Sequence, residues 1–245
     1  MTEASTARDY LAGLAARIAA LFDANAQAID AAATAIEETS ATDGLVYIFG
    51  TGHSHMIAEE AHYRAGGLAL TVPVLATATM LHEGAIASTA FERMAGVIEP
   101  ILDRYPIGPN DVLFVISNSG VNAVPVEAAK IGKARGAKVV AITSEIYSRE
   151  AAKGRTRLAD VADIVLDNGA PSGDATVAVP NSDLKVGPVS TSIGAALMNA
   201  VLAEAATRLQ NSGKGAPIYL SANMPGSAEN NAQLIKHYRP RNPHL

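Results

Sequence analysis

The strongest constraint on the fold is a regular alternation between short apolar runs and helical stretches. Five runs rich in β-branched residues are predicted to be strands, at positions 45–49, 68–75, 111–116, 138–142 and 162–166. Helical patterns separate several of them, at 56–64, 123–135 and 148–152. Strands that alternate with helices favour a parallel sheet covered on both faces. We therefore predict an α/β fold, a flavodoxin-like doubly wound sandwich with a five-stranded parallel sheet.

A long N-terminal helix is predicted before the sheet, at about 7–39, because apolar residues recur there at mostly helical spacing. It packs either on its own domain or on a partner subunit, and the pattern does not separate the two. The 245 residues suit a single domain, 1–245, with a core at about 43–210 and a C-terminal tail at 211–245 that wraps it. Segment 168–189 is rich in turn-forming residues and is predicted to be a long loop.

The composition argues against several classes of site and partner. The chain has no cysteine, which removes disulfides, thiolate zinc sites and cysteine nucleophiles. A net charge of −5 disfavours nucleic-acid binding but not a small anion, because backbone amides bind phosphate without net positive charge. Residues 1–9 lack the basic start of a signal peptide, and no apolar run reaches the roughly 18 residues of a membrane span. We expect a cytoplasmic protein with no nucleic-acid or membrane partner.

A glycine-rich turn follows the first predicted strand and leads into a helix. It contains Gly50, Thr51, Gly52, His53 and Ser54. The glycines allow a tight turn and the close approach of a ligand, and the start of a helix presents unpaired N–H groups. A dinucleotide fingerprint would need a third glycine at position 55, which is a histidine. The turn either binds a ligand through Gly52, His53 and Ser54 or is an ordinary strand–helix connection.

A second polar turn follows the third predicted strand and is the most specific motif of the chain. Its candidate ligand-binding residues are Ser117, Asn118, Ser119, Gly120 and Asn122. Their hydroxyls, amides and backbone N–H groups can surround one phosphate by directed hydrogen bonds, without a lysine. Capping of the next helix would need only one such residue. We therefore favour phosphate binding over capping alone.

The two turns together resemble the sugar isomerase (SIS) family over roughly 43–210. GTGHS at 50–54 is similar to the family pattern G-x-G-x-S, and SNSGVN at 117–122 is similar to S-x-S-G-x-[ST], with asparagine in place of the last Ser or Thr. The chain most resembles a phosphosugar isomerase-like branch related to phosphoheptose and arabinose-5-phosphate isomerases. The resemblance implies a phosphosugar site lined by the polar residues of both turns, namely Ser54, Ser117, Asn118, Ser119 and Asn122. It also implies that a later Ser/Thr-rich turn at 187–195 brings Ser190 and Thr191 near the sugar.

Acid–base chemistry is predicted from a histidine and nearby carboxylates. Aldose–ketose isomerisation needs a base that moves a proton between C1 and C2 through an enediol, and a group that assists ring opening. LHEGA at 81–85 resembles the short His-Gly loop of SIS isomerases, which implies ring opening by His82, often in a neighbouring subunit's site. We assign proton transfer to Glu83, with Glu60 as the second candidate base. The alternative for His82 and Glu83 is a solvated turn.

Metal binding is weakly suggested by spacing alone. His53, His55, Glu59 and His62 include pairs three and four residues apart, which share a helix face and could hold zinc. Some phosphoheptose isomerases use zinc, but their residue pattern does not carry over to this chain. We predict no metal and no cofactor.

The predicted function is binding of a sugar phosphate and its isomerisation. Two alternatives stay open, a non-catalytic phosphosugar-binding module that regulates a protein partner and an etherase-type lyase acting on an amino sugar phosphate. The two turns would serve all three functions, and only the acid–base residues separate them. The long N-terminal helix, and the family habit of sharing active sites between subunits, predict a homodimer or homotetramer.

Overall fold

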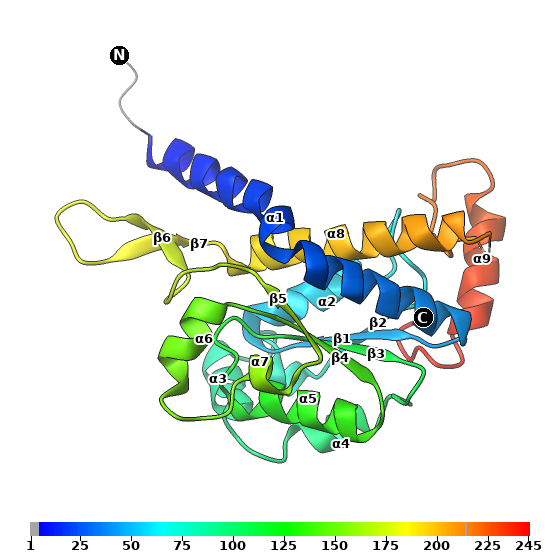
Figure 1. The fold of residues 1–245 in the computed structure, drawn as a ribbon, viewed down its shortest axis with the longest axis horizontal. Coiled ribbons are helices and arrows are strands. Elements are labelled where there is room, and N and C mark those ends of the chain that lie inside the picture. The colour runs from blue at the N-terminus through cyan, green and yellow to red at the C-terminus, as the bar shows by residue number, and fades with distance from the viewer. Residues whose placement is uncertain (1–4, 214) are drawn as a thin grey trace.

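The central sheet has five parallel strands in the order β2-β1-β3-β4-β5 (Figure 1). The computed structural model describes residues 5–213 and 215–245, so that part of the polar start at 1–9 lies outside the described residues. The strands are β1 (Val46–Gly50), β2 (Thr71–Val74), β3 (Val112–Ile116), β4 (Lys138–Thr143) and β5 (Ile164–Asp167). Strand order reverses between β1 and β3, which confirms the predicted flavodoxin-like sheet.

Helices cover both faces of this sheet (Figure 1). One face carries α1 (Thr6–Ala41), α2 (His55–Ala61) and α8 (Ser190–Asn211). The other carries α4 (Ile98–Leu102), α5 (Ala123–Ala134) and α7 (Leu158–Val161). Every residue of β1 and β3 is buried as a result, which explains their continuous apolar sequences. None of the helices in the described residues has the length and apolar character needed to cross a membrane.

The remaining helices lie at the ends of the sheet and in the tail. They are α3 (Ala85–Glu92), which contacts α5, α6 (Glu145–Ala152), which follows β4, and α9 (Ser227–Tyr238). The sequence predicted a helix at 148–152, within α6, but gave no element to the segment that forms α3.

The N-terminal helix α1 has two halves with different environments. Its second half packs on the domain, and Asn25 is buried there beside the end of β5. The Asn25 side chain donates to the Asp167 carbonyl (3.0 Å) and accepts from the Asp167 N–H (2.8 Å). The first half leaves Leu11, Ile18 and Phe22 exposed, by 63%, 40% and 65%. The helix therefore packs on its own domain and also presents an uncovered apolar stripe.

Segment 168–189 is not the structureless loop that its composition predicted. It contains an antiparallel hairpin of β6 (Ala175–Ala178) and β7 (Lys185–Pro188). The Tyr10 hydroxyl of α1 donates to the Pro188 carbonyl (2.8 Å) and holds the hairpin beside that helix. Most side chains of the hairpin are exposed or half-buried, and so its sequence lacks the apolar run of a core strand.

The tail returns to the sheet and contacts the amino ends of the strands. Asp111, buried just before β3, accepts hydrogen bonds from the N–H groups of Leu45 (2.7 Å) and Gly108 (2.8 Å). Arg241 forms an ion pair with the same carboxylate (2.8 Å). Asn242 donates to the Thr71 carbonyl at the start of β2 (3.4 Å). These bonds fix the tail against the sheet.

Strand β2 lies at an edge of the sheet, which explains how it accommodates a proline. Pro73 pairs in register with Ile48 of β1 and has no N–H to offer on its other side. The proline therefore costs no hydrogen bond within the sheet.

Candidate functional site

The two predicted ligand-binding turns begin side by side at one edge of the sheet. β1 and β3 are neighbouring parallel strands, and Gly50 at the end of one pairs in register with Ile116 at the end of the other. The turns at 51–54 and 117–122 therefore meet where the strand order reverses. Ligands of doubly wound sheets bind outside the carboxyl ends of the strands at this point.

The first turn is a single 3₁₀ turn, Gly52–Ser54, that leads into α2. At Gly50 an added Cβ would lie 2.6 Å from the Ser54 carbonyl group, so this position requires glycine. Gly52 has a φ of +50°, in the left-handed region that glycine adopts without strain. His53 is exposed and Ser54 is half-buried, and both remain within reach of a ligand at this edge.

The second turn is shaped by its own polar groups. The Ser117 hydroxyl accepts from the Gly120 N–H (3.2 Å), and the Asn118 side chain accepts from Asn168 (3.1 Å). Gly120 has a φ of +60°, and an added Cβ would lie 2.7 Å from Oγ1 of Thr143. Among the described residues, half-buried Ser119 takes no part in these bonds and is left for a ligand.

Asn122 precedes α5 but does not cap it. Its side chain makes no capping hydrogen bond and instead donates to the carboxylate of Glu92, at the end of α3 (3.0 Å). The first N–H groups of α5 therefore receive no side-chain cap, which leaves donors for an anion. Glu92 was missed by sequence reasoning, because nothing in the sequence indicated that the segment around it would return to the second turn.

Ser190 and Thr191 lie at the start of α8, where a carboxylate is already present. Asp174 accepts from the N–H groups of Val189 (3.0 Å) and Ser190 (2.7 Å) and from the Ser190 hydroxyl (2.7 Å). A negative side chain at a helix start is favourable, because the first N–H groups carry partial positive charge. Ser190 thus joins the hairpin to α8, and Thr191 is half-buried beside it.

The predicted acid–base residues are distributed over two regions. His82 and Glu83 are exposed in the turn before α3. Glu60 faces α8, since its carboxylate accepts from Asn199 of that helix (3.3 Å), and it also pairs with Arg64, just beyond the end of α2.

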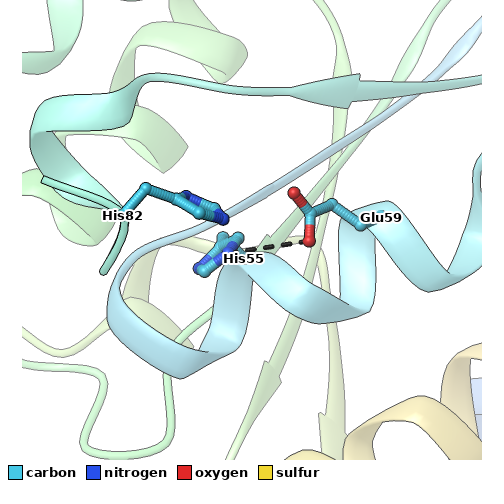
Figure 2. A group of neighbouring side chains, drawn as sticks. All are labelled: His55, Glu59 and His82. Carbon is cyan, nitrogen blue, oxygen red and sulfur yellow. Dashed lines mark ion pairs between the residues drawn. The ribbon is translucent and has the colours of Figure 1, made fainter.

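His55 and Glu59 of α2 lie beside His82 (Figure 2). The imidazole rings of His55 and His82 are in edge-on contact, with centroids 5.1 Å apart, and His55 Nε2 is 3.6 Å from Oε2 of Glu59. His62 instead lies at the far end of α2 beside His244, and burial lowers the pKa of His62. In the described part of the chain, the group able to hold a metal ion consists of His55, Glu59 and His82. The spacing in the sequence instead suggests His53, His55, Glu59 and His62. His53 and His62 do not belong to the group that the structure brings together.

Residues 9–144, more than half of the chain, match the family model of the SIS domain. The chain belongs to the SIS domain family. This result confirms the resemblance carried by the two turns. A UPF0309 protein from Brucella canis is 55% identical to this SIS domain protein over 236 residues, which cover 96% of this chain and 97% of that protein. A UPF0309 protein from Brucella anthropi shows the same identity and coverage.

Two solved structures share the fold at low sequence identity. Phosphoheptose isomerase from Neisseria gonorrhoeae is 18% identical with a TM-score of 0.54, and the match covers 82% of this SIS domain protein and 97% of that enzyme. A candidate phosphosugar isomerase from Silicibacter pomeroyi is 17% identical with a TM-score of 0.55, over 86% of this chain and 55% of that protein.

Proposed function

We propose that this SIS domain protein binds a phosphorylated sugar where β1 and β3 end and interconverts its aldose and ketose forms. The observation that carries the proposal is the turn at 117–122, which combines a free serine, an obligatory glycine and an uncapped helix start. The likeness in fold to phosphoheptose isomerase supports the same class of substrate. The cytoplasm is the compartment that we propose for this activity.

Charge suggests how the substrate would lie. Glu92, bonded to Asn122, would repel a phosphate on its side of the second turn. The phosphate would therefore bind beside Ser119 and Ser54, with N–H groups of the turn as further donors. The carboxylate of Glu92 would in turn accept hydrogen bonds from sugar hydroxyls. The phosphate of the ligand would thus lie beside the serines, and its hydroxyl-bearing chain would lie beside the carboxylate of Glu92.

The reaction would follow the roles assigned from the sequence. His82 would assist ring opening, and Glu83 would remove the proton from C2 of the aldose while the C1 oxygen gains a proton. The resulting enediol becomes the ketose when a proton is returned to C1 and the C2 hydroxyl gives up its proton to form the carbonyl. Glu60 remains the second candidate base, but its carboxylate already pairs with Arg64 and Asn199.

Phosphate binding can be tested by thermal shift against a panel of phosphosugars, with the unphosphorylated sugars as controls. We expect only the phosphorylated ligands to raise the melting temperature. Ser119→Ala should weaken binding by about 1–3 kcal/mol, the usual cost of losing a hydrogen bond to a charged group. Ser182→Ala, in the exposed hairpin turn, is the matched control and should bind normally. Equal shifts with free sugars would refute the phosphate site.

Catalysis is tested on the ligand that this screen identifies. Glu83→Gln should abolish isomerisation and leave affinity nearly unchanged. Full activity in this variant, with loss in Glu60→Gln, would move the role of the base to Glu60. Binding without turnover in the unsubstituted protein would favour the regulatory module, and release of lactate from an amino sugar phosphate ether would favour the lyase.

We infer further that the protein assembles with copies of itself through the first half of α1. Leu11, Ile18 and Phe22 are exposed there, and a cavity of about 180 Å³ between α1 and α8 is lined by Ile18, Phe22 and Leu197. Apolar side chains along one helix face gain free energy when a second copy covers them. A homodimer is the simplest assembly of this kind.

A further inference from the structure

Three side chains of metal-ligand type converge at the amino end of α2. His55 and Glu59 extend from the helix, and His82 extends toward them from the turn before α3 (Figure 2). One ligand atom from each lies within 4.8 Å of the other two. In a tetrahedral zinc site, bonds of roughly 2.0–2.2 Å place ligand atoms about 3.4 Å apart. The 3.6 Å between His55 Nε2 and Glu59 Oε2 nearly meets this spacing, and His82 supplies a third ligand atom within 4.8 Å of both.

His55 is held in the orientation that a metal ligand requires. Its side chain is 3% exposed, and Nδ1 donates a short hydrogen bond to the Gly52 carbonyl. This bond places the proton on Nδ1 and leaves the lone pair of Nε2 directed toward Glu59. Metal-binding histidines commonly donate their second nitrogen to a carbonyl in this way.

Two hydrogen-bond acceptors face each other in this group. The Nε2 lone pair of His55 and the carboxylate of Glu59 face each other, and neither has a proton to donate to the other. A bound cation or an added proton would satisfy both groups. The edge-on contact of the His82 ring brings a second imidazole to the same place, which favours a cation with several ligands.

We propose that His55, Glu59 and His82 bind one divalent transition-metal ion, with zinc as the representative. Two imidazole nitrogens and one carboxylate suit zinc and its neighbours in the first row, whereas magnesium and calcium prefer oxygen ligands. Three protein ligands leave a fourth position open. Glu59 and His82 are exposed, so this position is accessible to water or to a ligand. The proposal does not require that the protein binds a sugar phosphate.

A metal here would change the role of His82. The lone pair of a metal-bound imidazole is no longer available to accept a proton. Ring opening would then depend on polarisation of a sugar oxygen by the ion, and no longer on a free histidine.

The test is a zinc titration of the full chain, produced without a polyhistidine tag and stripped with a chelator. Isothermal titration with zinc chloride, and metal analysis after dialysis, should give one zinc ion per chain, and magnesium chloride should give no binding. Glu59→Gln and His82→Asn should each weaken zinc affinity at least tenfold. Glu60→Gln and His53→Ala are matched controls, because they change a neighbouring carboxylate and a neighbouring histidine outside the group.

Two outcomes would overturn the proposal. One is absence of zinc binding at micromolar concentrations, which would leave His55 and Glu59 as a polar pair within one helix. The other is a loss of zinc affinity in the control variants that equals the loss in Glu59→Gln and His82→Asn. His55→Ala should also lose zinc binding, and circular dichroism will show whether this variant of a buried residue still folds. The variants of the exposed residues Glu59 and His82 test the proposal even if His55→Ala does not fold. Since the titration contains no sugar, its result is independent of the phosphosugar screen.

Discussion

Substitution of Gly120 by alanine tests the geometry of the second turn. The φ of +60° at this position costs an alanine about 1–2 kcal/mol, because its Cβ crowds the next carbonyl. The new Cβ would also lie 2.7 Å from Oγ1 of Thr143, and overpacking of this kind costs about 1–3 kcal/mol. We therefore expect Gly120→Ala to lower the free energy of unfolding by about 2–5 kcal/mol and to abolish phosphosugar binding.

Gly169→Ala separates the two contributions. Gly169 has the same φ of +60°, but no atom lies within 4 Å of its added Cβ. It should therefore lose only the backbone part, about 1–2 kcal/mol. Urea unfolding followed by far-ultraviolet circular dichroism measures both variants. In a Thr143→Ala background the extra cost at Gly120 should disappear. Equal losses for the two glycine variants would refute the reasoning, because they would show that Thr143 does not constrain the turn.

Three further predictions concern stability, pH and assembly. Asp111→Ala removes a buried acceptor of two backbone N–H groups and an ion-pair partner, and should cost about 3–5 kcal/mol in urea unfolding. Asp103→Ala, which removes an exposed ion pair, is the control and should lower the free energy of unfolding by less than about 1 kcal/mol. Similar losses in Asp103→Ala and Asp111→Ala would contradict the importance given to the buried carboxylate. Burial lowers the pKa of His62 below its ordinary value of 6.5, so the folded state resists protonation of this histidine and the free energy of unfolding falls as the pH drops below 6.5. In urea unfolding, His62→Gln should therefore flatten the loss of stability between pH 7.5 and 5.5. An unchanged pH dependence in this variant would exclude His62 as the source of that loss. Phe22→Asp should reduce the mass measured by light scattering to that of one chain, about 25.2 kDa. Ile86→Asp, at an exposed position of α3, is the control and should leave the measured mass unchanged. An unsubstituted protein with the mass of one chain would disprove assembly.

The sheet could be predicted from the sequence because most of its strands are buried on both faces, and only the edge strand β5 is half-buried. Each core strand is a continuous apolar run that ends at glycine or polar residues, and this pattern is strong even in a single sequence. The Gly50 and Gly120 turns were found for the same reason, since both follow such strands. The hairpin at 175–188 was missed because its side chains are largely exposed and carry no apolar run.

Contacts between distant elements could not be predicted. His55 and Glu59 share a helix face by spacing, but the approach of His82 depends on how the turn before α3 folds back. Glu92 reaches Asn122 for a similar reason, across thirty residues of sequence. Periodicity gives the face of an element and not its neighbours. The partners of the site residues therefore had to come from the structure.

The amide of Asn25 and the proline of β2 have a consequence for how chains meet one another. β5 and β2 are the two edges of the sheet, and an open edge strand is a template for adding a strand from another molecule. Asn25 occupies both backbone hydrogen-bonding groups of Asp167 at one edge, and Pro73 has no N–H to offer at the other. Intermolecular strand addition is therefore disfavoured at both edge strands, β5 and β2. The sheet edges are thereby protected from the cross-β stacking that leads to aggregates. A specific and reversible contact between copies, as proposed for α1, would have to form on the helical surface.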